Sequence, residues 1–228
     1  MIKNLLQNYI KDYKITLKEN QYEQFQKYFE LLAEWNEKMN LTAITDESGV
    51  ALKHFADSLS LLNFVDIPQN SSLVDVGTGA GFPGVVLKIA RPDIKLTLID
   101  SLNKRLVFLG EVCAQLGIEA ELIHSRAEDG ARDEKLRESF DFAASRAVAR
   151  MNVLSEYCLP YVKVGGAFCA MKGAQANEEF KESLNAINTL GGKLENKYFF
   201  ELPENGGERA IAVVRKVRNT PQKYPPSI

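Results

Sequence analysis

The stretch that decides the fold is DVGTGAGFPG, which runs from Asp75 to Gly84. An apolar strand is expected at residues 73–76, which include the first two residues of this stretch, and a helix is expected from Pro83 onward. Four glycines close together let the backbone turn tightly and approach a ligand, because glycine lacks a Cβ atom and tolerates positive φ. The free N–H groups of the following helix attract a polar or anionic ligand. The stretch therefore predicts a nucleotide-cofactor loop between a strand and a helix.

Two cofactors fit such a loop. The last three glycines match the G-x-G-x-x-G spacing of dinucleotide enzymes, and Asp100 ends the second expected strand at a distance suited to binding a ribose. That interpretation leaves Gly77 and Thr78 unexplained. Counted from Asp75, the same stretch is D-x-G-x-G-x-G, which is similar to the first motif of class I S-adenosylmethionine-dependent methyltransferases. Asp100 serves either cofactor, since both carry a ribose.

The remainder of the chain after residue 70 favours the methyltransferase. Short apolar runs alternate with helical stretches, a pattern typical of βα units with a parallel sheet. Strands are expected at 73–76, 95–99, 120–123, 140–144 and 167–171, and helices near 83–90, 103–116, 127–137, 152–161 and 177–190. The turn-rich PENGGE separates two more strands, at 197–202 and 209–217, which predicts an antiparallel hairpin. The expected fold is α/β, a Rossmann-like class I methyltransferase with a mostly parallel seven-stranded sheet that ends in an antiparallel hairpin.

The first seventy residues are expected to be helical. Apolar residues recur every three or four positions between residues 18 and 40, which indicates an amphipathic helix. A shorter helix is expected over 1–14, and another, capped by Asp46 or Ser48, runs to about residue 65. We expect an N-terminal helical extension at 1–70, a methyltransferase domain at 71–220 and a tail at 221–228.

Composition sets broad limits. The chain has 228 residues, of which 45% are hydrophobic and 25% charged, with a formal net charge of -2. This charge argues against a dedicated basic coat for nucleic acid. From Arg209 to the end, however, five basic residues and no acidic one occur, which indicates a local basic strip. Charged residues interrupt the N-terminal segment and no long apolar run follows, so we expect a cytoplasmic protein without a membrane span, and buried free thiols at its three cysteines.

Five segments together resemble the bacterial RsmG family, also called GidB. They are WNEKMNLTAI (35–44), HFADSL (54–59), DVGTGAGFPG (75–84), SRAED (125–129) and SRAVAR (145–150). The resemblance covers nearly the whole chain. Members of this family are 16S ribosomal RNA methyltransferases that use S-adenosylmethionine to methylate N7 of a guanosine in the decoding-region loop. The resemblance therefore implies that cofactor, and 16S RNA or the small ribosomal subunit as the partner.

The resemblance also implies site residues. The cofactor-binding residues expected from the motif and the resemblance together are Asp75, Gly77, Gly79, Gly81, Phe82, Asp100, Ala127, Glu128 and Arg146. Arg146 has three possible partners: the methionine carboxylate of the cofactor, an RNA phosphate, or a surface carboxylate at Asp141 or Glu128.

The residues expected on the RNA side are Asn36, Asn40, His54, Asp57, Arg150, Lys172, Arg209 and Arg215. His54 and Asp57 are three positions apart and share a helix face, although capping or a core hydrogen bond is the commoner role of such a pair. The chain departs from the family pattern at its end, where Pro225 and Pro226 replace the basic residues that usually follow a KYPR-like tail. This puts an RNA-binding role of the tail in doubt.

The expected chemistry needs no proton removal, because guanine N7 carries an in-plane lone pair that attacks the methyl group directly. We therefore assign no catalytic residue and expect catalysis by positioning. We expect no bound metal, and we expect the protein to be a monomer. Two alternatives stay open: a methyltransferase that acts on another substrate, such as a protein or a small molecule, and a regulatory protein that binds cofactor and RNA without chemistry.

Overall fold

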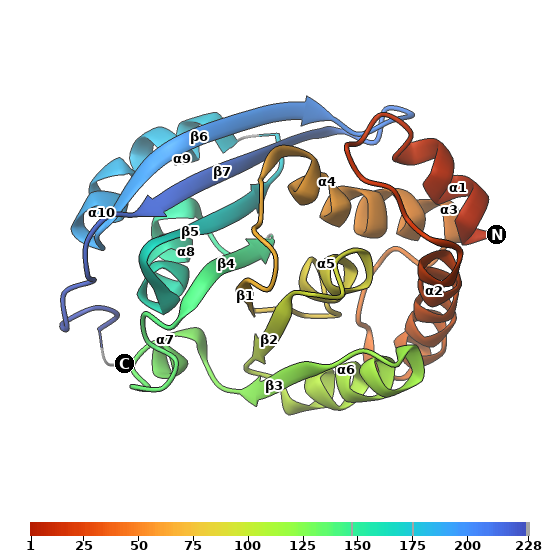
Figure 1. The fold of residues 1–228 in the computed structure, drawn as a ribbon, viewed down its shortest axis with the longest axis horizontal. Coiled ribbons are helices and arrows are strands. Elements are labelled where there is room, and N and C mark those ends of the chain that lie inside the picture. Colours follow the sequence, from red (N-terminus) through yellow and green to blue (C-terminus); the bar gives the residue numbers. More distant parts are fainter. Residues whose placement is uncertain (147, 175, 227–228) are drawn as a thin grey trace.

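The computed structural model describes residues 1–146, 148–174 and 176–226 (Figure 1). Its centre is one seven-stranded sheet in the order β3-β2-β1-β4-β5-β7-β6. The strands are β1 (Ser72–Val76), β2 (Lys95–Asp100), β3 (Ala120–His124), β4 (Phe140–Arg146), β5 (Val162–Lys172), β6 (Gly192–Glu201) and β7 (Glu208–Lys216). The first five are parallel, and β7 is antiparallel to both β5 and β6. The expected α/β class, the mostly parallel sheet and the terminal hairpin are confirmed.

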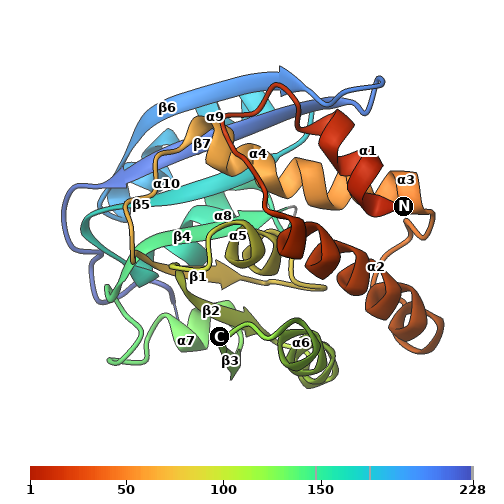
Figure 2. The ribbon, with the colours of Figure 1, turned by 45° about the vertical axis from the view of Figure 1, so that its right-hand side comes forward.

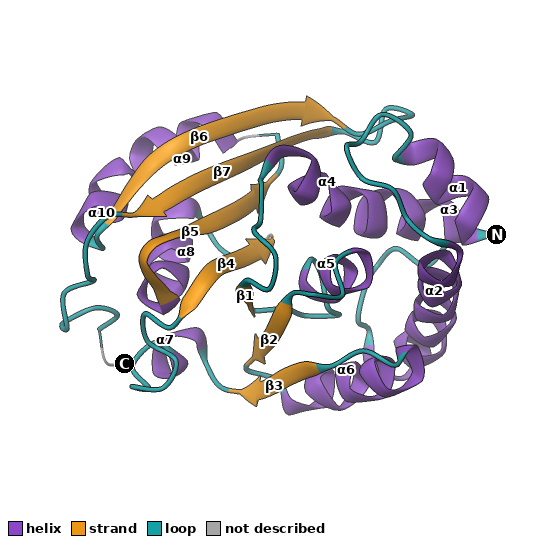
Figure 3. Ribbon diagram, viewed as in Figure 1, coloured by secondary structure: helices purple, strands orange, loops and turns teal. Residues whose placement is uncertain are grey.

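Helices cover both faces of the sheet (Figure 3). Adjacent residues of a strand point to opposite faces, and accordingly Leu73 and Val74 of β1 belong to two different hydrophobic clusters. One face carries α5 (Gly84–Ala90) and α6 (Asn103–Leu116), and the other carries α7 (Ala127–Gly130), α8 (Met151–Cys158), α9 (Ala176–Glu182) and α10 (Leu184–Thr189). Both faces are therefore buried, as a parallel sheet requires.

The first seventy residues form helices that pack on the α5 and α6 face (Figure 2). They are α1 (Ile2–Tyr9), α2 (Glu19–Met39), α3 (Glu47–Val50), a π-helical stretch (Ala51–Ala56) and α4 (Asp57–Phe64). Asp46 caps α3, because its Oδ1 accepts a hydrogen bond from the Gly49 N–H at 2.6 Å. The apolar side chains of these helices join the same hydrophobic cluster as α5 and α6. The extension and the sheet consequently share one core on this face.

Several expected boundaries were wrong. The helix expected over 127–137 ends at Gly130, where the chain enters turns that include a bond from the Lys135 N–H to Asp133 Oδ1 at 2.9 Å. The helix expected over 177–190 breaks at Ser183, whose hydroxyl donates to the Phe180 carbonyl at 2.9 Å. β5 and β6 begin five residues earlier than expected, because Val162 pairs with Phe140 of the parallel strand β4 and Gly192 pairs with Lys216 of the antiparallel strand β7. The N-terminal helix ends at Tyr9, well before residue 14.

The C-terminal segment does not form one basic surface. Lys216 is fully buried, and its ammonium lies 2.9 Å from the Glu138 carboxylate. Beyond it the chain returns to the turns after α7, where Arg137 donates to the carbonyls of Thr220 and Tyr224 at 2.9 and 3.0 Å (Figure 1). The expected tail at 221–228 thus packs against the body as far as Pro225, whose carbonyl accepts from Arg132, and residues 227–228 lie outside the described residues.

The three cysteines, Cys113, Cys158 and Cys169, are free thiols and are all buried, as expected. Within the described ranges, no helix is both long and apolar enough to span a bilayer.

Candidate functional site

The loop between β1 and α5 is held by Asp75. This side chain is fully buried, and its Oδ2 accepts hydrogen bonds from the Gly84 N–H and the Thr78 hydroxyl, both at 2.8 Å. Its second oxygen, Oδ1, is buried without a hydrogen-bond partner among the described residues. Burial raises the pKa of Asp75 to about 6, although the bonds from Thr78 and Gly84 lower it. The carboxylate therefore fixes the loop and keeps one unused acceptor.

Two glycines of the loop have different surroundings. Gly79 has φ +60°, and a Cβ added to it would meet no atom within 4 Å. Gly81 has φ +99°, and a Cβ there would lie 2.8 Å from Val85 Cγ2, 2.9 Å from Leu109 Cδ2 and against the hydroxyl of Tyr28. Tyr28, on α2, donates to the Ala80 carbonyl, so this helix of the extension braces the loop. Gly79 thus faces open space, and Gly81 faces the extension.

These surroundings predict different effects for two alanine substitutions. Gly81→Ala should lower the free energy of unfolding by about 3 kcal/mol or more, because backbone strain and overpacking add. Gly79→Ala should lower the free energy of unfolding by only about 1–2 kcal/mol, because a residue with a Cβ is strained in the left-handed conformation. Its main effect should be on cofactor affinity. Denaturant unfolding of both variants measures the difference. Equal losses of stability would contradict the proposed bracing by Tyr28.

The loop is also attached to the neighbouring strand. Asp100, which is 2% exposed at the end of β2, accepts from the Gly79 N–H through Oδ2 and from the Leu102 N–H through Oδ1, each at 2.9 Å. Arg105 of α6 lies 3.4 Å from the same Oδ2. Each carboxylate oxygen has two lone pairs, so the group retains acceptor capacity for hydroxyl donors.

A first cavity of about 490 Å³ opens beside this loop. It lies where the carboxyl ends of β1, β2 and β4 meet, beside the position at which the strand order reverses, and ligands of open α/β sheets bind there. Its wall includes Gly77, Asp100, Ala127, Glu128, Arg146 and Val148. Of the residues expected to bind cofactor, the structure thus places five around one cavity, while Asp75, Gly79, Gly81 and Phe82 lie in or under the loop.

Arg146 ends β4 and turns toward the extension. Its Nη1 donates to the Lys53 carbonyl at 2.9 Å and to Asp57 Oδ2 at 3.2 Å, and its Nη2 lies 3.2 Å from His54 Nδ1. The expected surface partners, Asp141 and Glu128, were wrong, since Asp141 pairs with Lys163 instead. The guanidinium carbon lies 5.0 Å from the centroid of the Phe82 ring, within cation–π range. Arg146 therefore joins β4, the extension and the glycine loop.

His54 completes this cluster. Its ring stacks on Phe82 with centroids 4.5 Å apart and planes 17° apart, and its Nε2 lies 2.8 Å from the Thr42 hydroxyl. Burial, and then the charge of Arg146, lower the pKa of His54 to about 3. His54 Nδ1 lies 3.2 Å from the Arg146 guanidinium, which can only donate, and 3.1 Å from the Lys53 carbonyl, which can only accept. The lowered pKa makes the imidazole of His54 neutral.

The His54 assignment predicts a pH response. The imidazole should remain neutral at pH 5, and ¹⁵N NMR should show one protonated and one unprotonated ring nitrogen. Because the folded pKa lies below the ordinary value of 6.5, the stability that His54 contributes is complete above pH 6.5. It falls by about 1.4 kcal/mol per pH unit as the pH drops further toward 3. A charged His54 at pH 5 in the folded protein would contradict the assignment.

A second cavity, of about 270 Å³, lies on the other side of Arg146. Its wall includes Lys53, His54, Asp57, Arg146, Lys172 and Arg209. Arg209 Nε lies 3.3 Å from Asp57 Oδ1, so one carboxylate joins two arginines. Among the described residues, Arg146 is the only one that lines both cavities. Two binding spaces therefore adjoin across a single side chain.

The other residues expected on the RNA side are more scattered. Asn36 fixes the turn before Thr42, because its side chain accepts from the Thr42 N–H at 2.8 Å and donates to the Thr42 carbonyl at 3.0 Å. Asn40 ends α2 in a left-handed conformation. Arg150 is exposed and paired with Glu182. Arg215 forms an ion pair with Glu195. In the ladder between β5 and β7, Arg215 lies opposite Ala167, whereas Lys172 at the site lies opposite Ala210, so Arg215 lies at the other end of these two strands.

Sequence reasoning missed three contributors. Lys53 lines the second cavity, Arg105 lines the first, and Tyr28 braces the loop. Lys53 directly precedes the HFADSL segment, so its neighbourhood was a usable signal. Tyr28 offered none, because it belongs to the ordinary apolar stripe of α2.

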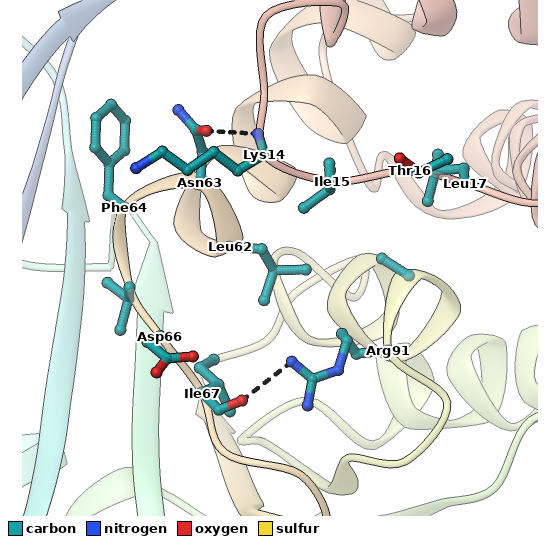
Figure 4. A pocket seen from close by; sticks show the side chains of 12 residues that line it. Lys14, Ile15, Thr16, Leu17, Leu62, Asn63, Phe64, Asp66, Ile67 and Arg91 are labelled. Atoms are coloured by element: carbon teal, nitrogen blue, oxygen red, sulfur yellow. Dashed lines mark hydrogen bonds between the residues drawn. The ribbon is translucent and has the colours of Figure 1, made fainter.

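A third cavity, of about 500 Å³, lies away from this site (Figure 4). It is formed where the segment before β1 meets the end of α5 and the loop before α2, at the amino end of the parallel strands. Arg91 there donates to the Ile67 carbonyl at 3.0 Å and pairs with Asp93 at 2.7 Å. The guanidinium of Arg91 is thus already bound to groups of the protein itself.

Comparison with known proteins identifies relatives over most of the chain. The family profile described as "GidB: rRNA small subunit methyltransferase G" matches residues 21–206. A protein named ribosomal RNA small subunit methyltransferase G from Geobacillus sp. (strain WCH70) is 53% identical over 212 residues, covering 92% of this chain and 89% of its own length. A protein of the same name from Leuconostoc citreum (strain KM20) is 52% identical over 219 residues, covering 95% of this chain and 91% of its own.

Solved structures share the fold. A SAM-dependent O-methyltransferase from Thermotoga maritima superposes with a TM-score of 0.55 at 15% identity, covering 83% of this chain and 73% of its own. M. jannaschii TYW2 in complex with AdoMet gives a TM-score of 0.51 at 13% identity, covering 65% and 70%. At these identities the likeness concerns the fold, which is that of class I methyltransferases.

Proposed function

This chain belongs to the GidB family of rRNA small subunit methyltransferase G proteins, and on that premise we propose that it transfers the methyl group of S-adenosylmethionine to N7 of a guanosine in 16S rRNA. The observation that carries the proposal is the pair of cavities that adjoin at Arg146. A methyltransferase needs two such spaces, one for the methyl donor and one for the acceptor, in contact with each other.

The first cavity and the loop beside it fit S-adenosylmethionine by the chemistry of their residues. Asp75 Oδ1, under the loop, is a buried acceptor that has no partner among the described residues, and the carboxylate of Asp100 in the cavity wall can accept hydrogen bonds from ribose hydroxyls. Ala127 and Glu128 begin α7 at one wall, where backbone groups and a carboxylate suit the edge of adenine. When bound, this cofactor supplies an electrophilic methyl group on a sulfonium.

The chain itself acts by positioning. Guanine N7 presents an in-plane lone pair and loses no proton, so no side chain has to act as a base. The extension and the glycine loop enclose the two reactants, and alignment within such a closed site supplies about 7–11 kcal/mol. Phe82 and His54 stack on each other beside Arg146, and these two buried rings limit access of water to this junction.

We propose that the partner is 16S rRNA or the small ribosomal subunit, and that the enzyme acts in the cytoplasm as a monomer. We also propose the division into an extension at 1–70, a methyltransferase domain at 71–220 and a tail at 221–228. In this division, the extension and the domain together line the acceptor side of the site, and the domain lines the donor side.

Two measurements test the proposal. S-Adenosylhomocysteine should raise the thermal unfolding temperature, whereas NAD should not, because only a ligand that binds the folded state stabilises it. With S-adenosylmethionine carrying a labelled methyl group, label should appear in 16S rRNA that lacks the modification and not in ribosomal protein. Stabilisation by NAD alone, label in protein alone, or binding without transfer would each overturn the proposal.

A further inference from the structure

Four basic side chains line the second cavity, and they differ in how their charge is used. Arg146 and Arg209 share the carboxylate of Asp57 at 3.2 and 3.3 Å, and the side chain of Asp57 is only 7% exposed. Lys172 lies 2.7 Å from the Glu179 carboxylate. Lys53 is exposed and has no carboxylate within ion-pair distance among the residues described. Counting the described residues alone, the wall therefore contains three paired cations and one unpaired cation.

This arrangement separates two kinds of ligand group. A phosphate that approached Arg146 or Arg209 would have to displace a buried carboxylate of the same sign, whose uncompensated burial is costly. An uncharged base meets no such repulsion. The same wall also offers apolar surface from Ile44, Met171 and Phe200. The volume, about 270 Å³, is just below the roughly 300–1,000 Å³ of pockets for drug-sized ligands, so it suits one base rather than a length of chain.

On the premise of the function proposed above, we propose that the second cavity receives the unpaired guanine base, that Lys53 at its rim binds an adjoining backbone phosphate, and that Asp57 is a positioning residue which excludes phosphate from the arginine pair. Lys53 and Arg146 are connected directly, because the Lys53 carbonyl accepts from Arg146 Nη1 at 2.9 Å. The π-helical stretch that contains Lys53 and His54 thus presents the phosphate contact and the base contact side by side.

The test is the salt dependence of RNA binding, which counts phosphate contacts. The probes are a stem–loop RNA with an unpaired guanosine, taken from the decoding region of 16S rRNA, and an unrelated single-stranded RNA of equal length. Lys53→Ala should weaken binding of the stem–loop about fivefold at 100 mM salt and reduce the slope of log K against log salt by about 0.7. Lys53→Arg should restore both the affinity and the slope. Lys27→Ala, an exposed lysine on α2, is the matched control and should change neither.

Asp57→Asn should have the opposite effect on binding. It frees the arginine pair for phosphate, so the unrelated RNA should bind more tightly and the slope should steepen, while turnover on the stem–loop falls. Asp57→Glu, which keeps the charge, should recover the wild-type slope. A merely structural role of Asp57 predicts weaker binding of both RNAs and no steepening of the slope.

The outcomes separate this inference from the proposed function. If the wild-type protein transfers no methyl group to RNA, the proposed function fails. If it does transfer methyl but Lys53→Ala leaves the slope unchanged, or Asp57→Asn flattens it, this inference alone is overturned. Should Asp57→Asn fail to fold, as judged by thermal unfolding with S-adenosylhomocysteine, the Lys53 variants still decide the matter.

Discussion

Replacing Arg146 with alanine is expected to lower methyl transfer by about 100-fold or more, with the affinity for S-adenosylhomocysteine changed much less. Arg146 stands between the two cavities, and its guanidinium is bound on the acceptor side by Lys53, Asp57 and His54. Its removal leaves Asp57 with one arginine partner and opens the wall against which the base is aligned. Loss of one such fixed group in an enclosed site costs about 10²–10³ in turnover.

The measurement is single-turnover methyl transfer to RNA, with cofactor affinity determined separately by calorimetry. Arg146→Lys should recover little, because a lysine cannot contact a carbonyl, a carboxylate and a ring nitrogen at once. Arg218→Ala is the control, since Arg218 is exposed and its side chain forms hydrogen bonds to Asn188 alone among the described residues. If cofactor affinity falls as far as turnover, Arg146 belongs to the cofactor side and the division of the site is wrong.

Asp75→Asn is expected to separate stability from function. The folded pKa of Asp75, about 6, lies above its ordinary value of 3.8, so burying the ionised carboxylate costs up to about 3 kcal/mol at neutral pH. Asparagine keeps one oxygen to accept from Gly84 and Thr78 but carries no charge. The variant should be at least as stable as the wild type at pH 7, and its affinity for cofactor should fall about tenfold or more, because the free carboxylate oxygen is lost.

The contribution of Asp75 to the free energy of unfolding should change with pH. A raised folded pKa means that this stability is present below pH 3.8 and is lost as the pH rises through about 6. The difference between wild type and Asp75→Asn in the free energy of unfolding should therefore open between pH 4 and 6. His54 acts equally in both proteins and cancels from this difference. Asp75→Ala is the contrast, since it loses both hydrogen bonds and should be less stable than Asp75→Asn. A difference that does not vary with pH would contradict the assignment.

Local sequence signals predicted most of the fold. The glycine loop, the apolar runs and the PENGGE turn are short-range patterns, and each corresponds to an element that the structure contains. Those patterns did not show which strands lie next to each other in the sheet. β5 extends back to Val162 and β6 to Gly192 because neighbouring strands support them, and no residue within either segment announces that. The same holds for the break at Ser183, where one hydroxyl competes with the helix.

The site was predictable in its residue types and less so in its contacts. Asp75 and Asp100 follow from their places beside the glycine loop. The link between Asp57 and Arg146 spans 89 residues, so it arises only when the extension folds onto β4. Charge in the sequence was misleading for the same reason: Lys216 is counted in the basic strip but is buried against Glu138. Among the described residues, the other basic side chains of the second cavity form ion pairs with carboxylates, and Lys53 does not. This difference depends on contacts in the fold and not on composition.

The central claim is the identity of the methylated atom. The most direct measurement incubates the protein and S-adenosylmethionine with 16S rRNA from cells that lack the modification, followed by borohydride reduction and aniline cleavage, which cut RNA at N7-methylguanosine. The account predicts a single new cleavage, at one guanosine in the decoding-region loop, that disappears with Arg146→Ala. Methylation without cleavage, which would place the methyl group on another atom, or cleavage at many guanosines would contradict it.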